Sequence, residues 1–310
     1  MDNRFLGDIS CKRRRVDSEL RIPDESRHFW ADAISRAQRT ALSRISSTLT
    51  PRQQRLFERT YFGSFLHLPE TKFCGILVHA FLLRQLHPPF ARDEFWFRIS
   101  GVDVRFSPFE FVLVTGLSFS RRTDVSSYIP RSSGHRIRST YFRGCSKVQY
   151  HDIERVFLSR AWGDDDIDAV KLALLYILHM VLLGNDRRKK VSTEYLQLVD
   201  HLDGFNSYPW GVVVWQMTYD SMSQTCERLC SGRMQEIRKY DLYGFPFAFQ
   251  YWIYETLETL HEWIDLVDLY VSPRMLRWLT RDVPVWTHIG RIFTGDPTGL
   301  LHPRDILMYP

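Results

Sequence analysis

The stretch from Glu94 to Leu117 constrains the fold most, because two strand patterns and a helix start follow one another without a gap. Apolar and polar side chains alternate along residues 95–99 and again along residues 102–106. This period of two predicts a pair of half-buried strands. Ser100-Gly101 between them predicts a tight hairpin turn, because glycine tolerates a positive φ.

Helices are predicted on both sides of this hairpin. Ser107-Pro108-Phe109-Glu110 combines an N-cap serine, a proline at the first helical position and a glutamate that completes a capping box. Gly116 is placed where that helix should stop. Before the hairpin, apolar residues at helical spacing predict a helix over residues 73–86. A lone hairpin is marginal in water, so we expect it to pack on these helices.

The polar face of the hairpin has two interpretations. It is either the solvated side of a packing unit or a ledge that binds a partner. The residues of this predicted ledge are Trp96, Arg98, Asp103 and Arg105.

Several phrases of the chain resemble a plant domain of unknown function. They are Tyr61–Leu66, Leu68-Pro69, Leu77–His79, Leu82–Arg84, Phe95–Ile99, Phe106–Leu117 and Tyr240–Pro246, within a region from about residue 50 to about residue 260. In that family the domain often precedes a cysteine peptidase domain of the ubiquitin-like-protease (SUMO-protease) type, in proteins linked to Mutator-like transposable elements. The pattern is more distantly similar to the plant mobile domain. No catalytic residues are known for the plant domain of unknown function, so none can be carried over to this sequence.

Composition supports a folded, intracellular protein. The chain has 310 residues, of which 44% are hydrophobic and 14% aromatic, so ample material for a core is present. Five cysteines, an odd number at irregular spacing, favour reduced thiols. Neither a secretory signal nor an apolar run long enough to span a bilayer is found. The net charge of +5 permits contact with nucleic acid without requiring it.

Three basic clusters are candidate binding elements. The first, Lys12, Arg13, Arg14 and Arg15, predicts a nuclear localisation signal, unless it is a solvated run on a flexible arm. The others are predicted loops that contact phosphates or are merely solvated. They comprise Arg121, Arg122, Arg131, Arg136 and Arg138 in one loop, and Arg187, Arg188, Lys189 and Lys190 in the other.

The second half of the chain is predicted to be helical. Asp164-Asp165-Asp166 favours a helix N-terminus over a metal site, since consecutive helical residues point about 100° apart. Residues 210–230 and 245–264 are predicted helices. The aromatic residues of the second one suggest core packing in preference to a base-stacking platform. The expected organisation is an arm over 1–28, a helix–hairpin–helix unit over 29–117, a basic loop over 118–145, a helical half over 146–282 and an irregular tail over 283–310.

No complete catalytic or cofactor site is found. A ubiquitin-like protease needs His, Asp and then a nucleophilic Cys. His261 and Asp265 are followed by no cysteine, and no Asp-Cys-Gly occurs. Cys226 and Cys230 lack the further ligands that zinc requires, and phosphate-binding glycine loops are absent. We therefore expect no enzyme, no metal and no cofactor.

The sequence thus predicts a mainly α domain with one inserted β-hairpin near residues 94–106. Its predicted function is that of a non-catalytic interaction module in a plant transposon-derived nuclear protein, with a protein as partner. One alternative is a nucleic-acid-binding module that uses the basic loops 121–138 and 187–190. Another is the amino-terminal part of a ubiquitin-like-protease peptidase. The oligomeric state is not predicted.

Overall fold

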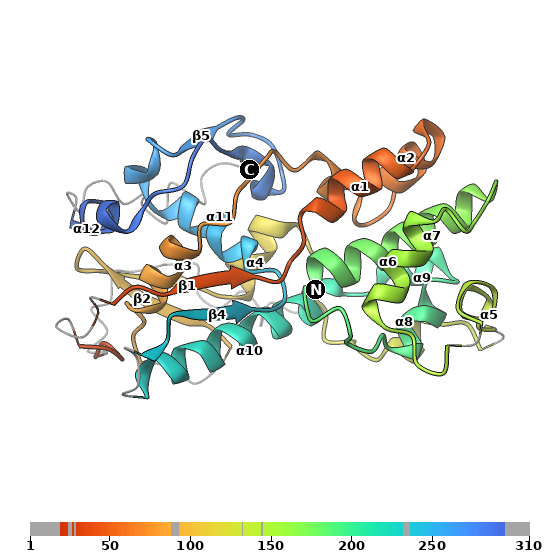
Figure 1. Cartoon of the computed structure of the whole chain (residues 1–310), viewed down its shortest axis with the longest axis horizontal. Helices are drawn as coiled ribbons and strands as arrows, with labels where there is room; N and C mark the ends of the chain where they lie inside the picture. Colours follow the sequence, from red (N-terminus) through yellow and green to blue (C-terminus); the bar gives the residue numbers. More distant parts are fainter. Residues whose placement is uncertain are drawn as a thin grey trace.

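The computed structural model describes residues 19–23, 27, 29–87, 93–131, 133–143, 145–231 and 236–294. Helices dominate it (Figure 1), which confirms the predicted mainly α fold. The α-helices are α1 (Thr40–Thr48), α2 (Pro51–Glu58), α3 (Gly75–Leu82), α4 (Pro108–Thr115), α5 (Arg136–Tyr141), α6 (Tyr150–Leu158), α7 (Asp166–Ile177), α8 (Thr193–Leu198), α9 (Leu202–Ser207), α10 (Trp210–Cys230), α11 (Phe247–Thr256) and α12 (Trp286–Thr294). No helix of the described residues is long and apolar enough to cross a membrane.

The strands form three small two-stranded sheets. They are β1 (Asp32–Ser35) with β4 (Lys239–Leu242), β2 (Phe95–Ile99) with β3 (Val102–Phe106), and β5 (Ile264–Leu266) with β6 (Trp278–Thr280). The β2–β3 pair is antiparallel and confirms the predicted hairpin. Its turn places Ser100 and Gly101 at φ of 48° and 80°. The other two sheets were not predicted.

The start and the end of α4 follow the sequence signals closely. Glu110 accepts a hydrogen bond from the Ser107 amide at 2.8 Å, and Ser107 Oγ accepts one from the amide of Phe109. Gly116 ends the helix in the left-handed region at φ 72°. Two successive local signals therefore fix both the hairpin and its following helix.

β1 and β4 run parallel and bring together two segments that are far apart in sequence (Figure 1). The register pairs Asp32 with Lys239 and Ser35 with Leu242. Arg36 extends the pairing, because its guanidinium bonds Asp241 at 2.6 Å. On one side β1 packs against α3, which is buried from Leu77 to Leu82. The observed helix is therefore shorter than the one predicted over residues 73–86, and it is buried on all sides.

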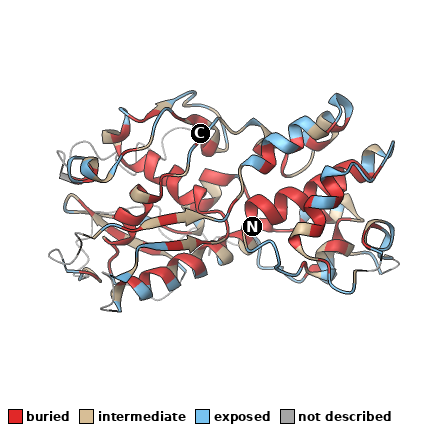
Figure 2. Cartoon of the chain, in the orientation of Figure 1, coloured by how far each residue is buried: buried red, intermediate tan, exposed pale blue. Residues whose placement is uncertain are grey.

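α7 forms the centre of the other half of the molecule. It packs against α1, α2 and α6, and Figure 2 shows it as almost entirely buried. Asp165 caps the helix by accepting hydrogen bonds from the amides of Ile167 and Asp168, which confirms capping as the role of this acidic run. A π-helical turn, Leu178–Leu182, continues it.

The aromatic residues of α11 are buried, so they form core and not a stacking platform. Phe249 and Trp252 pack against Phe97 and Phe106 of the hairpin with ring centroids 5.1–5.9 Å apart. α10 spans the predicted residues, but α11 ends at Thr256 and not near 264. Leu257 leaves the helix in extended conformation, and β5 begins at Ile264.

Two predicted irregular segments contain helices. The basic loop over 118–145 includes α5, whose start is held by a hydrogen bond from the Ile137 amide to Asp200. The tail over 283–310 includes α12, which buries Ile289, Ile292 and Phe293. Tertiary contacts stabilise both helices. The nearby prolines and arginines therefore wrongly indicated irregular structure in these two segments.

Candidate anion-binding pocket

The basic loop over 187–190 is fixed against the first turn of α6. The amides of Tyr150 and His151 donate hydrogen bonds to the carbonyls of Lys189 and Arg187 at 3.1 and 3.0 Å. Gln149 also bridges to Lys190. These backbone bonds give the loop a defined position beside α6, although its side chains are exposed.

α6 presents a buried face and a polar face, as expected for a surface helix. Ile153, Val156 and Phe157 are buried in the core. Glu154 and Arg155 lie three and four residues after His151, and Leu158 lies four and three residues after them, so these residues lie on one side of the helix. This side lines a pocket of about 470 Å³, completed by Arg44 from α1 and Arg187 from the loop.

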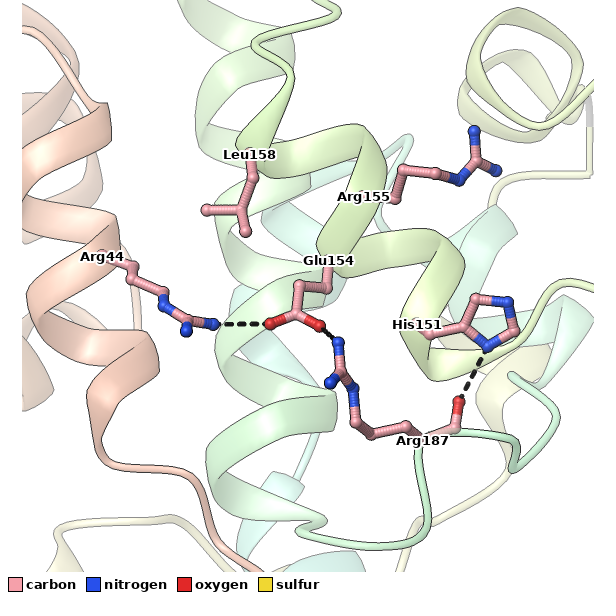
Figure 3. A pocket seen from close by; sticks show the side chains of 6 residues that line it. All are labelled: Arg44, His151, Glu154, Arg155, Leu158 and Arg187. Carbon is pink, nitrogen blue, oxygen red and sulfur yellow. Dashed lines mark hydrogen bonds and ion pairs between the residues drawn. The ribbon is translucent and has the colours of Figure 1, made fainter.

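Glu154 organises the pocket (Figure 3). Its side chain is only 6% exposed, and one oxygen accepts a hydrogen bond from Arg44 Nη1 at 2.6 Å. The other oxygen accepts one from Arg187 Nη2. A single buried carboxylate therefore holds two guanidinium groups that come from distant parts of the chain.

Both guanidinium groups keep contact with solvent. The Arg44 side chain is 45% exposed and that of Arg187 is 56% exposed. A guanidinium has several N–H donors and no acceptor, and the contacts with Glu154 occupy few of them. The remaining donors are available to a ligand oxygen that enters the pocket.

His151 and Arg155 form the rim. The His151 ring bonds the Arg187 carbonyl through Nδ1 at 3.2 Å, and Arg155 donates to Asp152 at 3.0 Å. Burial acts to raise the pKa of Asp152, but hydrogen bonds from the Gln149 amide and from Arg155 outweigh it and lower that pKa. Asp152 therefore stays ionised and holds Arg155 at the rim.

The charge of the lining residues favours an anion. Three arginines and one glutamate line the pocket, but the Arg155 guanidinium points away from Glu154 (Figure 3) and bonds Asp152. These three arginines, Glu154 and Asp152 together have a net charge of +1. Among the residues that the structure describes, no cysteine, serine or threonine lines the pocket. The arrangement can hold an anionic group by charge-assisted hydrogen bonds.

The structure distributes the predicted basic residues unevenly. Arg187 lines the pocket, whereas Arg188 bonds Asp186 at 2.8 Å. Arg136 of the other loop bonds Asp168 at the first turn of α7. Arg136 is therefore fixed at the start of α7, whereas the loop with Arg187 follows the π-helical turn that ends it. Arg121, Arg122 and Arg131 are exposed, and Arg138 is half-buried.

The hairpin ledge is a network of polar contacts. Arg98 bonds both carboxylate oxygens of Asp103 at 2.7 and 2.9 Å, and Arg105 bonds Glu110 at 3.2 Å. Trp96 donates its indole N–H to Glu94 at 2.8 Å. Partner binding by this ledge stays a prediction.

Three of the four cysteines that the structure describes are poor nucleophiles. Burial raises the pKa of Cys74 to about 11, and it also raises the pKa of Cys226 and of Cys230. No group of three or more His, Cys, Asp or Glu residues arranged for a metal ion occurs among the described residues. The predicted localisation residues Lys12, Arg13, Arg14 and Arg15 lie outside the described part of the chain.

Sequence reasoning missed most of the pocket. The spacing of His151, Glu154, Arg155 and Leu158 is a signal that would have placed these residues on one helix face. Arg44 gives no such signal, because it lies 110 residues before the glutamate that it bonds.

One comparison with known proteins gives a match. Residues 82–221 match the model of a family described as "Domain of unknown function (DUF1985)". This range includes the hairpin, α4, α6 and the loop with Arg187, but not Arg44. No curated protein and no solved structure matches the chain. From residue 82 to residue 221 the chain is therefore similar to a domain whose function is unknown.

Proposed function

We propose that this chain is a non-catalytic binding module whose pocket holds an anionic group of a partner. The observation that supports this function best is the pair of exposed guanidinium groups, Arg44 and Arg187, fixed by the buried Glu154. Fixing the donors before binding lowers the entropy lost when a ligand binds. The module would bind by complementary charge, which gives specificity and fast association.

The biological setting is also part of the proposal. The resemblance to plant domains that precede ubiquitin-like-protease peptidases supports a setting in a transposon-derived protein of the nucleus. There it would recruit a partner for the peptidase. A non-catalytic role is supported by the buried thiols Cys74 and Cys226 and by the arginine lining of the pocket. A nucleophilic cysteine normally has a lowered pKa, which neither of these residues has.

A charge-matched pair of double variants tests this function. Arg44→Gln/Arg187→Gln removes both guanidinium groups from the pocket, whereas Arg52→Gln/Arg188→Gln removes two exposed arginines that bond Asp166 and Asp186 instead. We expect the pocket variant to bind a fluorescein-labelled heparin fragment at least about tenfold more weakly than the control variant, which corresponds to about 1.4 kcal/mol. Fluorescence anisotropy measures both dissociation constants. Equal weakening by the two variants would exclude the pocket as the binding site.

Nucleic acid is the second candidate partner. Lys189 and Lys190 are exposed on the loop that closes the pocket, so a phosphate backbone passing over the loop would meet two further cations. The Lys189→Gln/Lys190→Gln variant should then reduce the slope of log affinity against log salt for duplex DNA by about 2. The control is Arg238→Gln/Lys239→Gln, which removes two exposed charges near β4. If both variants change the slope equally, or if duplex DNA does not bind, this candidate is rejected.

A further inference from the structure

We infer that the pocket between α1 and α6 recognises a phosphomonoester, presented by a phosphorylated side chain of a partner protein. This inference rests on the proposed function and names the anionic group. It follows from the charge, the shape and the surroundings of the pocket.

The pocket offers positive charge and several N–H donors to a phosphoryl group. Arg44, Arg155, Arg187, Glu154 and Asp152 together have a net charge of +1. A phosphomonoester has a charge of about −1.5 to −2 at pH 7 and three acceptor oxygens. A carboxylate or a phosphodiester offers only two unesterified oxygens on one centre, so it would accept from fewer of these donors.

The geometry suits several oxygens on one centre. Arg44 and Arg187 bond the two oxygens of one carboxylate, so both guanidinium groups are held at Glu154 (Figure 3). Planar guanidinium groups bind phosphate oxygens in pairs, which a lysine does not do. Glu154 acts here as a positioning residue, because it holds both arginines without being exposed itself.

The surroundings disfavour a continuous polyanion. Asp152 lies behind the rim, where it bonds Arg155, and Asp186 lies one residue before Arg187 with its side chain 48% exposed. A nucleic-acid backbone would have to pass these carboxylates as it leaves the pocket. A single phosphoryl group meets the arginines without approaching them.

The lip of the pocket suits a peptide. Leu158 lines the pocket and is 42% exposed, so an apolar residue beside the phosphorylated one can pack on it. Recognition of phosphorylated side chains by arginine clusters is a recurring binding mode. The lining includes no Phe, Tyr or Trp on which a nucleotide base would stack.

The test compares peptide pools of random sequence that differ at one fixed central residue. That residue is phosphoserine, serine or glutamate, and immobilised full-length chain captures each pool. We expect the phosphoserine pool to be retained at least tenfold better than the serine pool. We expect Arg187→Gln to lower this retention about tenfold, and Arg188→Gln to lower it less than twofold. Glu154→Gln should lower it as well, because the two arginines lose their common anchor.

Five results would overturn the inference, and they separate it from the proposed function. Equal retention of phosphoserine and serine pools, or equal loss in the Arg187→Gln and Arg188→Gln variants, contradicts a phosphoryl site. Preference for the glutamate pool keeps an anionic partner but rejects the phosphoryl group. Stronger binding of a 5′-phosphorylated oligonucleotide than of the phosphoserine pool assigns the pocket to nucleic acid. If circular dichroism shows that a variant has unfolded, the unaltered chain is used instead. Phosphoserine should then protect Arg187 from modification by phenylglyoxal. Absence of this protection contradicts the site.

Discussion

Replacement of Gly75 by alanine is expected to destabilise the folded chain by about 3 kcal/mol. Gly75 is the first residue of α3, where a Cβ atom would lie 2.0 Å from the carbonyl oxygen of Ala33 in β1. The obstacle is backbone, so no side-chain rotation relieves it. Either α3 or β1 must move, and β1 is held by its pairing with β4.

The matched control for this variant is Gly290→Ala in α12. A Cβ atom at Gly290 meets nothing within 4 Å. Alanine is the better helix former by up to about 1 kcal/mol, so this variant should be slightly more stable than the original chain. Urea unfolding followed by circular dichroism measures both changes. A neutral result for Gly75→Ala would mean that α3 and β1 are not packed as described.

Mild acid is expected to destabilise the protein through two buried histidines. Burial lowers the pKa of His79 and of His179 to about 4, from a usual value of 6.5. Both rings are held in the neutral form. His179 Nδ1 donates to the Leu175 carbonyl at 2.8 Å, and His79 Nε2 donates to the Phe29 carbonyl at 3.2 Å while Nδ1 lies 2.9 Å from Tyr240 Oη.

The sign of this effect follows from proton binding. Below pH 6.5 the unfolded chain binds protons at these histidines and the folded chain does not, so stability falls as the pH drops toward 4. Each histidine should lower the free energy of unfolding by about 2 kcal/mol between pH 7 and pH 5, and the pair by about 4 kcal/mol. The contribution of both histidines fades above pH 6.5, as the unfolded chain also loses its protons there.

Urea unfolding at pH 7, 6 and 5 measures this dependence. The His179→Gln variant should lose about half of the drop between pH 7 and pH 5, whatever its stability at pH 7. His67→Gln serves as the control, since that side chain is 60% exposed. A drop that persists unchanged in the His79→Gln/His179→Gln double variant would contradict the assignment of the acid sensitivity to these residues.

The sequence correctly predicted the local features that depend only on adjacent residues. The hairpin turn at Ser100-Gly101, the capping box at Ser107 and the stop at Gly116 each depend on a few adjacent side chains, and all three have the expected geometry. The same holds for the cap at Asp165. Local sterics and hydrogen bonding are sufficient to specify such features.

Features that depend on distant residues were not predictable in this way. Residues 32–35 have no strand pattern of their own, and they become β1 only because β4 lies beside them. In the pocket, the arrangement of Arg44 depends on Glu154, which belongs to another helix. Tertiary contacts override local propensity at such positions. The basic runs were visible in the sequence, but which arginine faces a pocket and which faces a neighbouring carboxylate was not.

The pairing of β1 with β4 has a consequence for how the protein is made. Arg36 directly follows β1 and Asp241 lies in β4, and the two residues are 205 positions apart in the sequence. During synthesis, the segment around β1 and α3 leaves the ribosome long before its partner strand exists. Contacts so distant in sequence slow folding and leave apolar surface exposed meanwhile. The apolar helix α3 therefore lacks its complete packing until residue 242 has emerged, and a fragment restricted to residues 82–221 lacks both strands of this sheet.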